Sequence, residues 1–182
     1  MRSTIFQKPG VTDGAWKSHH GSMRIVDFSV TKQLEDEYGG SLGCIVICTS
    51  NGKIGTITHL DTTDIDKVDD FIKTLDSELK NNKESTKVIL SGGSALNESK
   101  ELAKKIQQAM QTNGYKIIGS YLDQKTRNPR PKTAAIEKDK VLVKEFVNQN
   151  QDQITEISFS NGDKKTYSKE KELPDFVKNW GK

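Results

Sequence analysis

The alternation of apolar and polar positions predicts a chain of strands with two long helices in its middle. The segment 39–64 contains two runs rich in β-branched residues, joined by Asn51-Gly52, and this dipeptide is typical of a tight β-hairpin turn. Beyond the hairpin, apolar residues at helical spacing predict a first helix: Ile65, Val68, Ile72, Leu75 and Leu79. Thr63 with Asp66 resembles a capping box at its start.

Further strands are predicted on both sides of a second helix. The elements outside the first hairpin and helix are strands over 23–30, 87–91 and 115–123, a helix over 97–112, and a hairpin of 133–137 with 140–146. This order predicts an α/β (α+β) layered sandwich, with a mixed or antiparallel sheet and two main helices.

The pattern also divides the chain into three parts. Residues 1–23 are poor in apolar positions and predict an extended or poorly ordered lead-in. Residues 24–147 form the predicted domain. A Gln/Asn-rich hinge then begins the last part, 148–182, which is interpreted as a C-terminal hairpin and a short helix appended to the domain.

Charge and hydropathy narrow the classes of function. The 182 residues include 28 Lys and Arg and 25 Asp and Glu, a net charge of +3 with both signs interspersed. Nucleic-acid binders normally gather basic residues on one face, so that class is not expected. No apolar run has the length of a membrane-spanning helix, and the first residues lack the apolar stretch of a secretory signal. We expect no membrane partner and a cytoplasmic location, with a translocated effector left open.

The two cysteines, Cys44 and Cys48, are predicted to be free thiols. On a strand, a separation of four residues places their Cα atoms about 13 Å apart, whereas a disulfide needs less than about 7 Å. Free thiols fit a reducing compartment. Only His19, His20 and His59 add nitrogen ligands, so neither a metal site nor a cofactor is expected, and the first two histidines are interpreted as solvated.

The hairpin register places one cysteine beside a histidine. In a two-residue type I′ turn, Ser50 pairs with Lys53, and Cys44 then faces His59 closely enough for an imidazole nitrogen to reach the sulfur. Cys48 faces a glycine instead and is interpreted as a core thiol. A three-residue loop or a bulge would shift this register.

A cysteine beside a histidine can perform nucleophilic catalysis. The His59 imidazole can take the proton of the Cys44 thiol and return it to a leaving amine. Glycines at 39, 40 and 43 let the backbone before Cys44 turn sharply, and nearby amide N–H groups can then stabilise an oxyanion. The alternative is a small core cysteine beside a histidine whose hydrogen bonds are satisfied.

Several short motifs resemble one family of enzymes. SLGC at 41–44 with THLDTTD at 58–64 resembles the active-site hairpin of the protein N-terminal asparagine amidohydrolase family. The resemblance continues through KVILSGGSALNESKELAKKI, 87–106, and the AAIEKDKVLVKEF hairpin, and covers roughly 38–147. The related chemoreceptor glutamine deamidases share this succession. The resemblance implies a CheD-like fold. It also implies a thiol hydrolase that converts Asn or Gln of a protein or peptide to Asp or Glu and releases ammonia.

The resemblance also assigns catalytic roles. Cys44 would be the nucleophile and His59 the general base and acid. The receptor deamidases have a threonine six residues before the cysteine, where this chain has Tyr38, so Ser41 is the nearest hydroxyl for the third catalytic position. The spacing of 15 between the cysteine and the histidine is shorter than these families lead us to expect.

Substrate-binding residues are expected on both sides of this pair. Asp61 or Asp64 would attract the α-ammonium of an N-terminal residue, and Gly92-Gly93 would let a substrate backbone approach closely. The alternatives are helix capping for Asp64, turn formation or orientation of His59 for Asp61, and an ordinary turn for the two glycines.

The sequence leaves three functions open. The first is the thiol amidohydrolase, and the second is a catalytically inactive protein-interaction module on the same fold, which the Tyr38 departure favours. The third is a toxin-like deamidase that acts on a foreign protein. Arg127 and Arg130 would suit an acidic partner or lie in a solvated loop. Neither the natural substrate nor the oligomeric state follows from the sequence.

Overall fold

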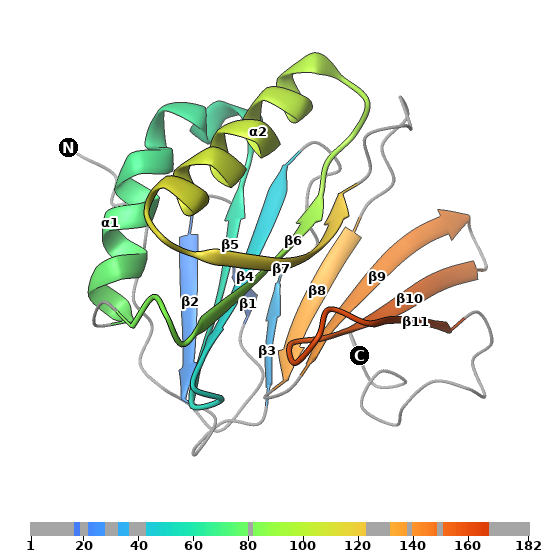
Figure 1. Ribbon diagram of the computed structural model, residues 1–182. Coiled ribbons are helices and arrows are strands. Elements are labelled where there is room, and N and C mark those ends of the chain that lie inside the picture. Colours follow the sequence, from blue (N-terminus) through green and yellow to red (C-terminus); the bar gives the residue numbers. More distant parts are fainter. Residues whose placement is uncertain are drawn as a thin grey trace.

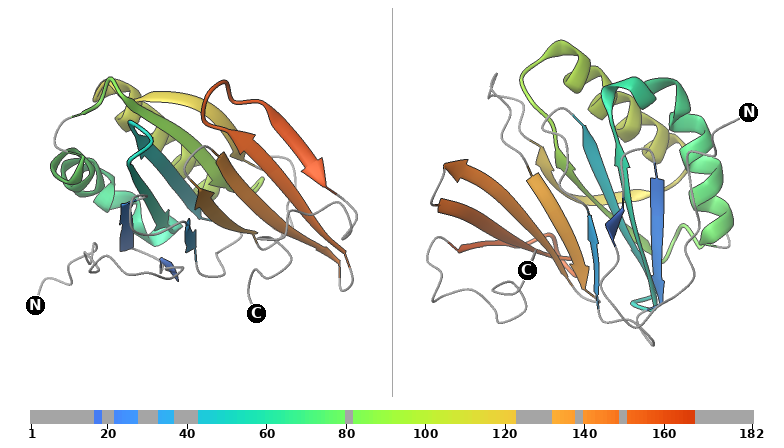
Figure 2. Two further views of the ribbon diagram at one scale, coloured as in Figure 1. Left: turned by 90° about the horizontal axis from the view of Figure 1, so that it is seen from below. Right: turned by 180° about the vertical axis from the view of Figure 1, so that it is seen from behind.

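Two β-sheets and a layer of helices are stacked on one another (Figures 1 and 2). The computed structural model describes residues 17–18, 22–27, 33–36, 43–79, 82–122, 132–137, 140–148 and 151–167. Its strands are β1 Lys17–Ser18, β2 Ser22–Asp27, β3 Gln33–Asp36, β4 Cys44–Ser50, β5 Ile54–Leu60, β6 Thr86–Gly92, β7 Lys116–Leu122, β8 Lys132–Glu137, β9 Lys140–Asn148, β10 Gln151–Ser158 and β11 Lys164–Tyr167. Its helices are the 3-10 helix η1 Thr62–Lys67 and the α-helices α1 Val68–Glu78 and α2 Asn97–Thr112.

The five-stranded sheet, in the order β2-β5-β4-β6-β7, is the middle layer. Its strand β4 is buried along its whole length, because the helices cover one face of the sheet and the second sheet covers the other. Fully covered strands have near-continuous apolar runs. The sheet is mixed, since β6 pairs with β7 in parallel and its other pairs are antiparallel. The coarse prediction of a layered α/β sandwich with two main helices is confirmed.

Each face of the middle sheet has its own core. The helix-side core includes Cys44, Val46, Cys48, Leu60, Val88 and Leu90 from the sheet and Val68, Phe71, Leu75, Leu102, Ile106 and Met110 from the helices. The core between the sheets includes Ile45, Ile47, Ile57 and Ile89 from the middle sheet and Ala134, Ile136, Val141, Val143, Ile157 and Phe159 from the second. Neighbours along β4 therefore belong to opposite cores, as the alternation of side chains in a strand requires.

The hairpin of β4 and β5 differs from the predicted register by one residue. Asn51 and Gly52 have φ of 54° and 63°, the left-handed values of a type I′ turn, and the Lys53 N–H donates to the Ser50 carbonyl over 3.0 Å. The ladder nevertheless pairs Ser50 with Ile54. Lys53 is thus an extra residue in the connection, and the predicted two-residue register is wrong.

The C-terminal hairpin belongs to the second sheet. That sheet has the order β1-β3-β8-β9-β10-β11, and β10 pairs with β9 from Gln151 to Ser158. The β10–β11 pairing confirms the predicted hairpin. Its Ile157 and Phe159 lie in the core between the sheets, so the hairpin is integrated into the sandwich rather than appended to it. The lead-in before residue 17 and the short helix predicted near the C-terminus lie outside the described residues.

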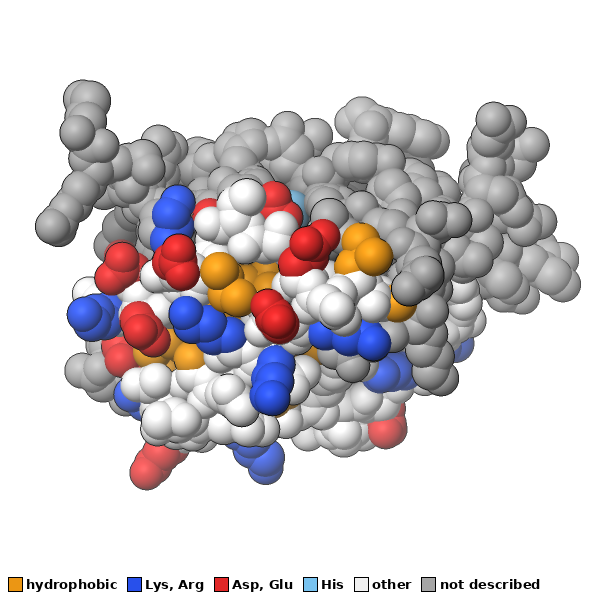
Figure 3. All heavy atoms as spheres, turned by 90° about the horizontal axis from the view of Figure 1, so that it is seen from above, with side chains coloured by type: hydrophobic (Ala, Val, Ile, Leu, Met, Phe, Trp, Pro, Cys, Tyr) orange, Lys and Arg blue, Asp and Glu red, His pale blue; other side chains and the backbone are white. Residues whose placement is uncertain are grey.

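The helical face carries charges of both signs. Figure 3 shows acidic and basic side chains interspersed on the face formed by α1 and α2. The residues concerned are Asp69, Asp70, Lys73 and Glu78 on α1 and Glu98, Lys100, Glu101, Lys104 and Lys105 on α2. This face of the described chain thus has no patch of a single sign. No helix among the described residues is long and apolar enough to cross a membrane.

Candidate functional site

Cys44 and His59 lie at the same end of the hairpin but on opposite faces of the sheet. The ladder pairs Cys44 with Leu60 and His59 with Ile45. Paired residues share a face, so His59 is on the side of the second sheet with Ile45, whereas Cys44 is on the helix side. The predicted facing pair is wrong in this structure, because a shift of one residue moves a side chain to the other face.

The Cys44 thiol is buried in the helix-side core. The residue is 1% exposed, and desolvation by burial raises its pKa from 9.0 to about 12. Cys48 is also buried there, and burial raises its pKa to about 12 against the lowering effect of the Thr56 side chain. Both are free thiols, as their spacing predicts. The interpretation of Cys48 as a core residue is confirmed.

The imidazole of His59 lies against the residue that precedes Cys44. A Cβ atom at Gly43 would be 2.9 Å from His59 Nε2 and 2.5 Å from the Leu60 carbonyl oxygen. His59 is itself 4% exposed. The glycine at position 43 is therefore what allows this histidine to sit beside the start of β4.

Gly92 and Gly93 come from β6 to the same place. Gly92 pairs with Cys44 across the sheet, and the Gly93 N–H donates to the Gly43 carbonyl over 2.8 Å. A Cβ at Gly92 would approach that carbonyl oxygen to 2.4 Å. The close approach that we predicted for a substrate backbone is made here by the chain's own Gly43. We call this meeting point of Gly43, Cys44, His59, Gly92 and Gly93 the Gly43 corner.

Asp61 and Asp64 form the capping box at the start of η1. The Thr62 N–H donates to Asp61 Oδ1 over 2.8 Å, and the Asp61 N–H donates to Asp64 Oδ2 over 2.9 Å. Asp64 is 1% exposed and lies 3.4 Å from Lys67 Nζ. Both carboxylates thus have the capping and turn-forming role that was the alternative to substrate binding. The box predicted two residues later, with Thr63 at the cap, is wrong.

Removing the Asp61 cap is expected to destabilise the fold, with Asp61→Ala losing about 1 kcal/mol of unfolding free energy. Asp61→Asn should keep nearly all of the stability, because asparagine caps helices as well as aspartate does. Urea unfolding of both variants measures the difference. An alanine variant as stable as the natural chain would contradict the cap. An asparagine variant as unstable as the alanine variant would show that the negative charge of Asp61 contributes more to stability than its capping hydrogen bond does.

Several predicted residues lie outside the described chain. One is Ser41, the candidate for the third catalytic position, and another is Tyr38, which stands where the receptor deamidases have a threonine. The others are Gly39, Gly40, His19, His20, Arg127 and Arg130. Within the described ranges, no group of three His, Cys, Asp or Glu side chains is placed to hold a metal ion.

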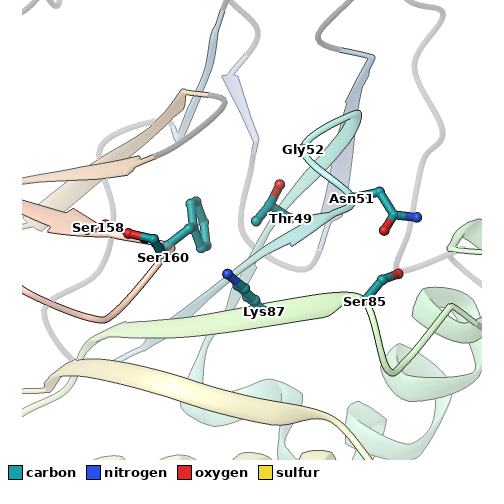
Figure 4. Close-up of a pocket in the computed structure, with 8 residues that line it drawn as sticks. Thr49, Asn51, Gly52, Ser85, Lys87, Ser158 and Ser160 are labelled. Atoms are coloured by element: carbon teal, nitrogen blue, oxygen red, sulfur yellow. Dashed lines mark hydrogen bonds between the residues drawn. The ribbon is translucent and has the colours of Figure 1, made fainter.

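A hollow of about 480 Å³, which no sequence motif predicted, lies at the other end of β4. Its described lining is Thr49, Asn51, Gly52, Ser85, Lys87, Ser158, Phe159 and Ser160, of which Figure 4 labels all but Phe159. The one sequence signal for this hollow is the alternation of side chains along β6, which places Lys87 on the same face of the strand as Ile89. The partners that surround the lysine come from segments far away in the chain.

Comparison with known proteins adds no family assignment. No protein-family model matches the chain, and no curated protein matches it either.

Proposed function

We propose that the chain is a cysteine-dependent amidohydrolase that hydrolyses Asn or Gln carboxamides of a protein or peptide and releases ammonia. The observation that supports this function best is the Gly43 corner. Residues from three motifs of the resemblance to deamidases meet there: Gly43 and Cys44 of SLGC, His59 of THLDTTD, and the Gly-Gly turn at 92–93, which comes from a strand about 30 residues further along the chain. The CheD-like version of the fold is part of the same proposal, supported by the strand, Gly-Gly turn and helix formed by β6 and α2.

The reaction uses residues of this corner. The thiolate of Cys44 attacks the carboxamide carbon, and backbone N–H groups near the start of β4 stabilise the oxyanion. His59 takes the thiol proton and gives it to the nitrogen as the C–N bond breaks, which releases ammonia and leaves a thioester. His59 then deprotonates a water molecule that hydrolyses the thioester to the carboxylate and regenerates the thiol. Ser41 is proposed as the third catalytic residue.

Substrate recognition uses groups beside the same pair. Asp61 and Asp64 form the capping box at the end of the strand that carries His59, and carboxylates at this place would attract an α-ammonium. The backbone of Gly92 and Gly93 lies opposite Cys44, where it would flank a bound carboxamide.

This mechanism requires the Cys44 thiol to leave the helix-side core. Cys44 is the first residue of β4 and follows Gly43, so a change of backbone conformation at these two residues reorients the thiol. The rest of β4 can keep its pairing during that change, because strand ends open at lower cost than strand centres.

The second candidate is a non-catalytic protein-interaction module. The observation that favours it is the likeness of the two thiols: Cys44 and Cys48 are both fully buried on the helix side, and burial raises the pKa of each to about 12. A thiol with this pKa is almost entirely protonated at neutral pH and is a poor nucleophile.

Alkylation separates the two candidates. Each single-thiol variant keeps one cysteine. The Cys48→Ala variant measures the reactivity of Cys44, and the Cys44→Ala variant measures that of Cys48, which is the matched buried control. The amidohydrolase predicts that Cys44 reacts with iodoacetamide well below pH 8, and that Cys48 reacts far more slowly. Mass spectrometry of folded protein over a pH series measures both rates. Equal inertness of the two thiols up to strongly alkaline pH would contradict the amidohydrolase and support the interaction module.

A further inference from the structure

The hollow at the Thr49 end of β4 is built by both sheets. The middle sheet contributes Thr49 and the Asn51-Gly52 turn from its central hairpin, and the second sheet contributes the last residue of β10 and the two residues that follow it. Its volume of about 480 Å³ lies within the range of small-molecule sites. Four further residues of β4 separate Cys44 from Thr49, which corresponds to about 17 Å along a strand. This pocket is therefore separate from the Gly43 corner.

Lys87 is the cation of the pocket. It pairs with Thr49 across β4 and β6, and in Figure 4 its ammonium reaches into the space between Thr49 and Ser160. Within the described part of the chain Lys87 forms no ion pair, and the described lining contains no Asp or Glu. A partly buried ammonium without a carboxylate favours an anionic ligand.

Thr49 supplies a second, independent indication. The residue is 5% exposed, and its Oγ1 atom has no hydrogen-bond partner among the described residues. A buried hydroxyl without a partner destabilises the fold, and a ligand oxygen in the pocket would supply the missing hydrogen-bond partner. Thr49 lies on the same face as Lys87, so the two side chains can bind one group together.

The opposite wall offers hydroxyls and an apolar surface. Ser158 Oγ and Ser160 Oγ are 2.7 Å apart and form a pair of hydroxyls on the side of the second sheet. Phe159 lies between them in sequence, is 3% exposed and belongs to the core between the sheets. An aromatic or apolar body can rest on Phe159 while its anionic group faces Lys87.

We propose that this pocket binds a small anionic ligand, a carboxylate or a phosphate ester, with an apolar or aromatic body. Lys87 and Thr49 hold the anionic oxygens, Ser158 and Ser160 donate or accept hydrogen bonds at the opposite wall, and Phe159 packs against the body. This binding is independent of the amidohydrolase activity, because it uses none of the residues of the Gly43 corner.

The test is a binding titration of the full chain at constant ionic strength. The probes are benzoate, phenyl phosphate and inorganic phosphate, and the readout is the movement of the Thr49 and Lys87 amide signals in NMR spectra. We expect benzoate or phenyl phosphate to bind more tightly than inorganic phosphate, because only they can pack against Phe159. The tighter of the two identifies the anionic group.

Variants locate the binding. Lys87→Gln should weaken the tighter probe about ten-fold or more, as expected for the loss of a charged hydrogen-bond partner, whereas Lys87→Arg should retain binding. Thr49→Val, which keeps the shape and removes the hydroxyl, should weaken it several-fold. Lys53→Gln is the matched control, since this exposed lysine beside the same turn does not line the pocket. Equal losses in Lys87→Gln and Lys53→Gln, or no binding of any probe at millimolar concentration, would overturn the proposal.

Discussion

Cys44→Ala and His59→Ala are each expected to abolish ammonia release from a carboxamide substrate, whereas Cys48→Ala is expected to retain it. Without the thiol no thioester forms, and without the imidazole the thiol keeps its proton, which the burial of Cys44 makes harder to remove. Loss of a nucleophile or its base lowers kcat on the order of 10⁴-fold or more. This is the largest effect that the proposed function predicts.

The measurement combines released ammonia with the mass change from carboxamide to carboxylate. Peptides that begin with a free or an acetylated Asn distinguish an amino-terminal substrate from a side-chain one, and the same pair with Gln identifies the carboxamide. If only the peptide with the free N-terminal Asn is a substrate, the enzyme recognises the α-ammonium group. In that case Asp61→Asn should raise KM more than it changes stability, because asparagine keeps the cap but removes the charge.

Cys48→Ala is the matched control for this experiment. Cys44 and Cys48 have the same face, the same burial and a similar rise of pKa, so alanine leaves a similar small gap at either position. A general effect of core disruption would lower activity in both variants. Full activity of the Cys44→Ala variant would contradict the amidohydrolase directly.

Local sequence signals predicted most elements and failed at one residue of the hairpin. The sequence predicted a helix over 97–112, and α2 has these bounds in the structure. The dipeptide Asn51-Gly52 also adopts the predicted left-handed conformation. The register depends on whether Lys53 joins the ladder or stays in the connection, and nothing in the local sequence decides this. That single residue moves His59 to the face opposite Cys44.

The start of the first helix shows a similar ambiguity. The stretch from Asp61 to Asp66 offers two overlapping boxes with the same spacing, one beginning at Asp61 and the other at Thr63. Strand β5 ends at Leu60, which makes Asp61 the first residue free to adopt the cap conformation. The choice therefore depended on where the preceding strand stops, and local capping rules do not contain that information.

The remaining differences come from contacts between distant segments. The integration of the C-terminal hairpin depends on β10 pairing with β9, and the pocket depends on Lys87 meeting Thr49 and Ser160 from three separate segments. Hydrophobic periodicity shows which face of a strand is buried, but it does not show which strand lies next to it. For this reason the motifs indicated the Gly43 corner, whereas alternation gave only the face on which Lys87 lies and not the partners that complete the pocket.

Gly92→Ala is expected to destabilise the fold strongly, well beyond the loss of the Asp61 cap. Gly92 has φ of +103°, a conformation that alanine adopts only with strain, and the added Cβ would lie 2.4 Å from the Gly43 carbonyl oxygen. Both costs fall on backbone atoms, which cannot rotate away as a side chain can. Together they should lower the unfolding free energy by about 3 kcal/mol or more, and the melting temperature by at least about 6 °C.

Gly119→Ala is the matched control, because Gly119 is a strand glycine on β7, the neighbour of β6. A Cβ at Gly119 would meet Ile157 Cγ2 at 3.5 Å and Ile89 Cγ1 at 3.8 Å, which are ordinary packing distances. Its alanine variant should stay within about 1 kcal/mol of the natural chain. Urea unfolding of the two variants, with equal m-values, measures the contrast. Equal stability of the two would mean that the Gly43 corner is not packed this tightly, and that Gly92 is conformationally free to serve a substrate instead.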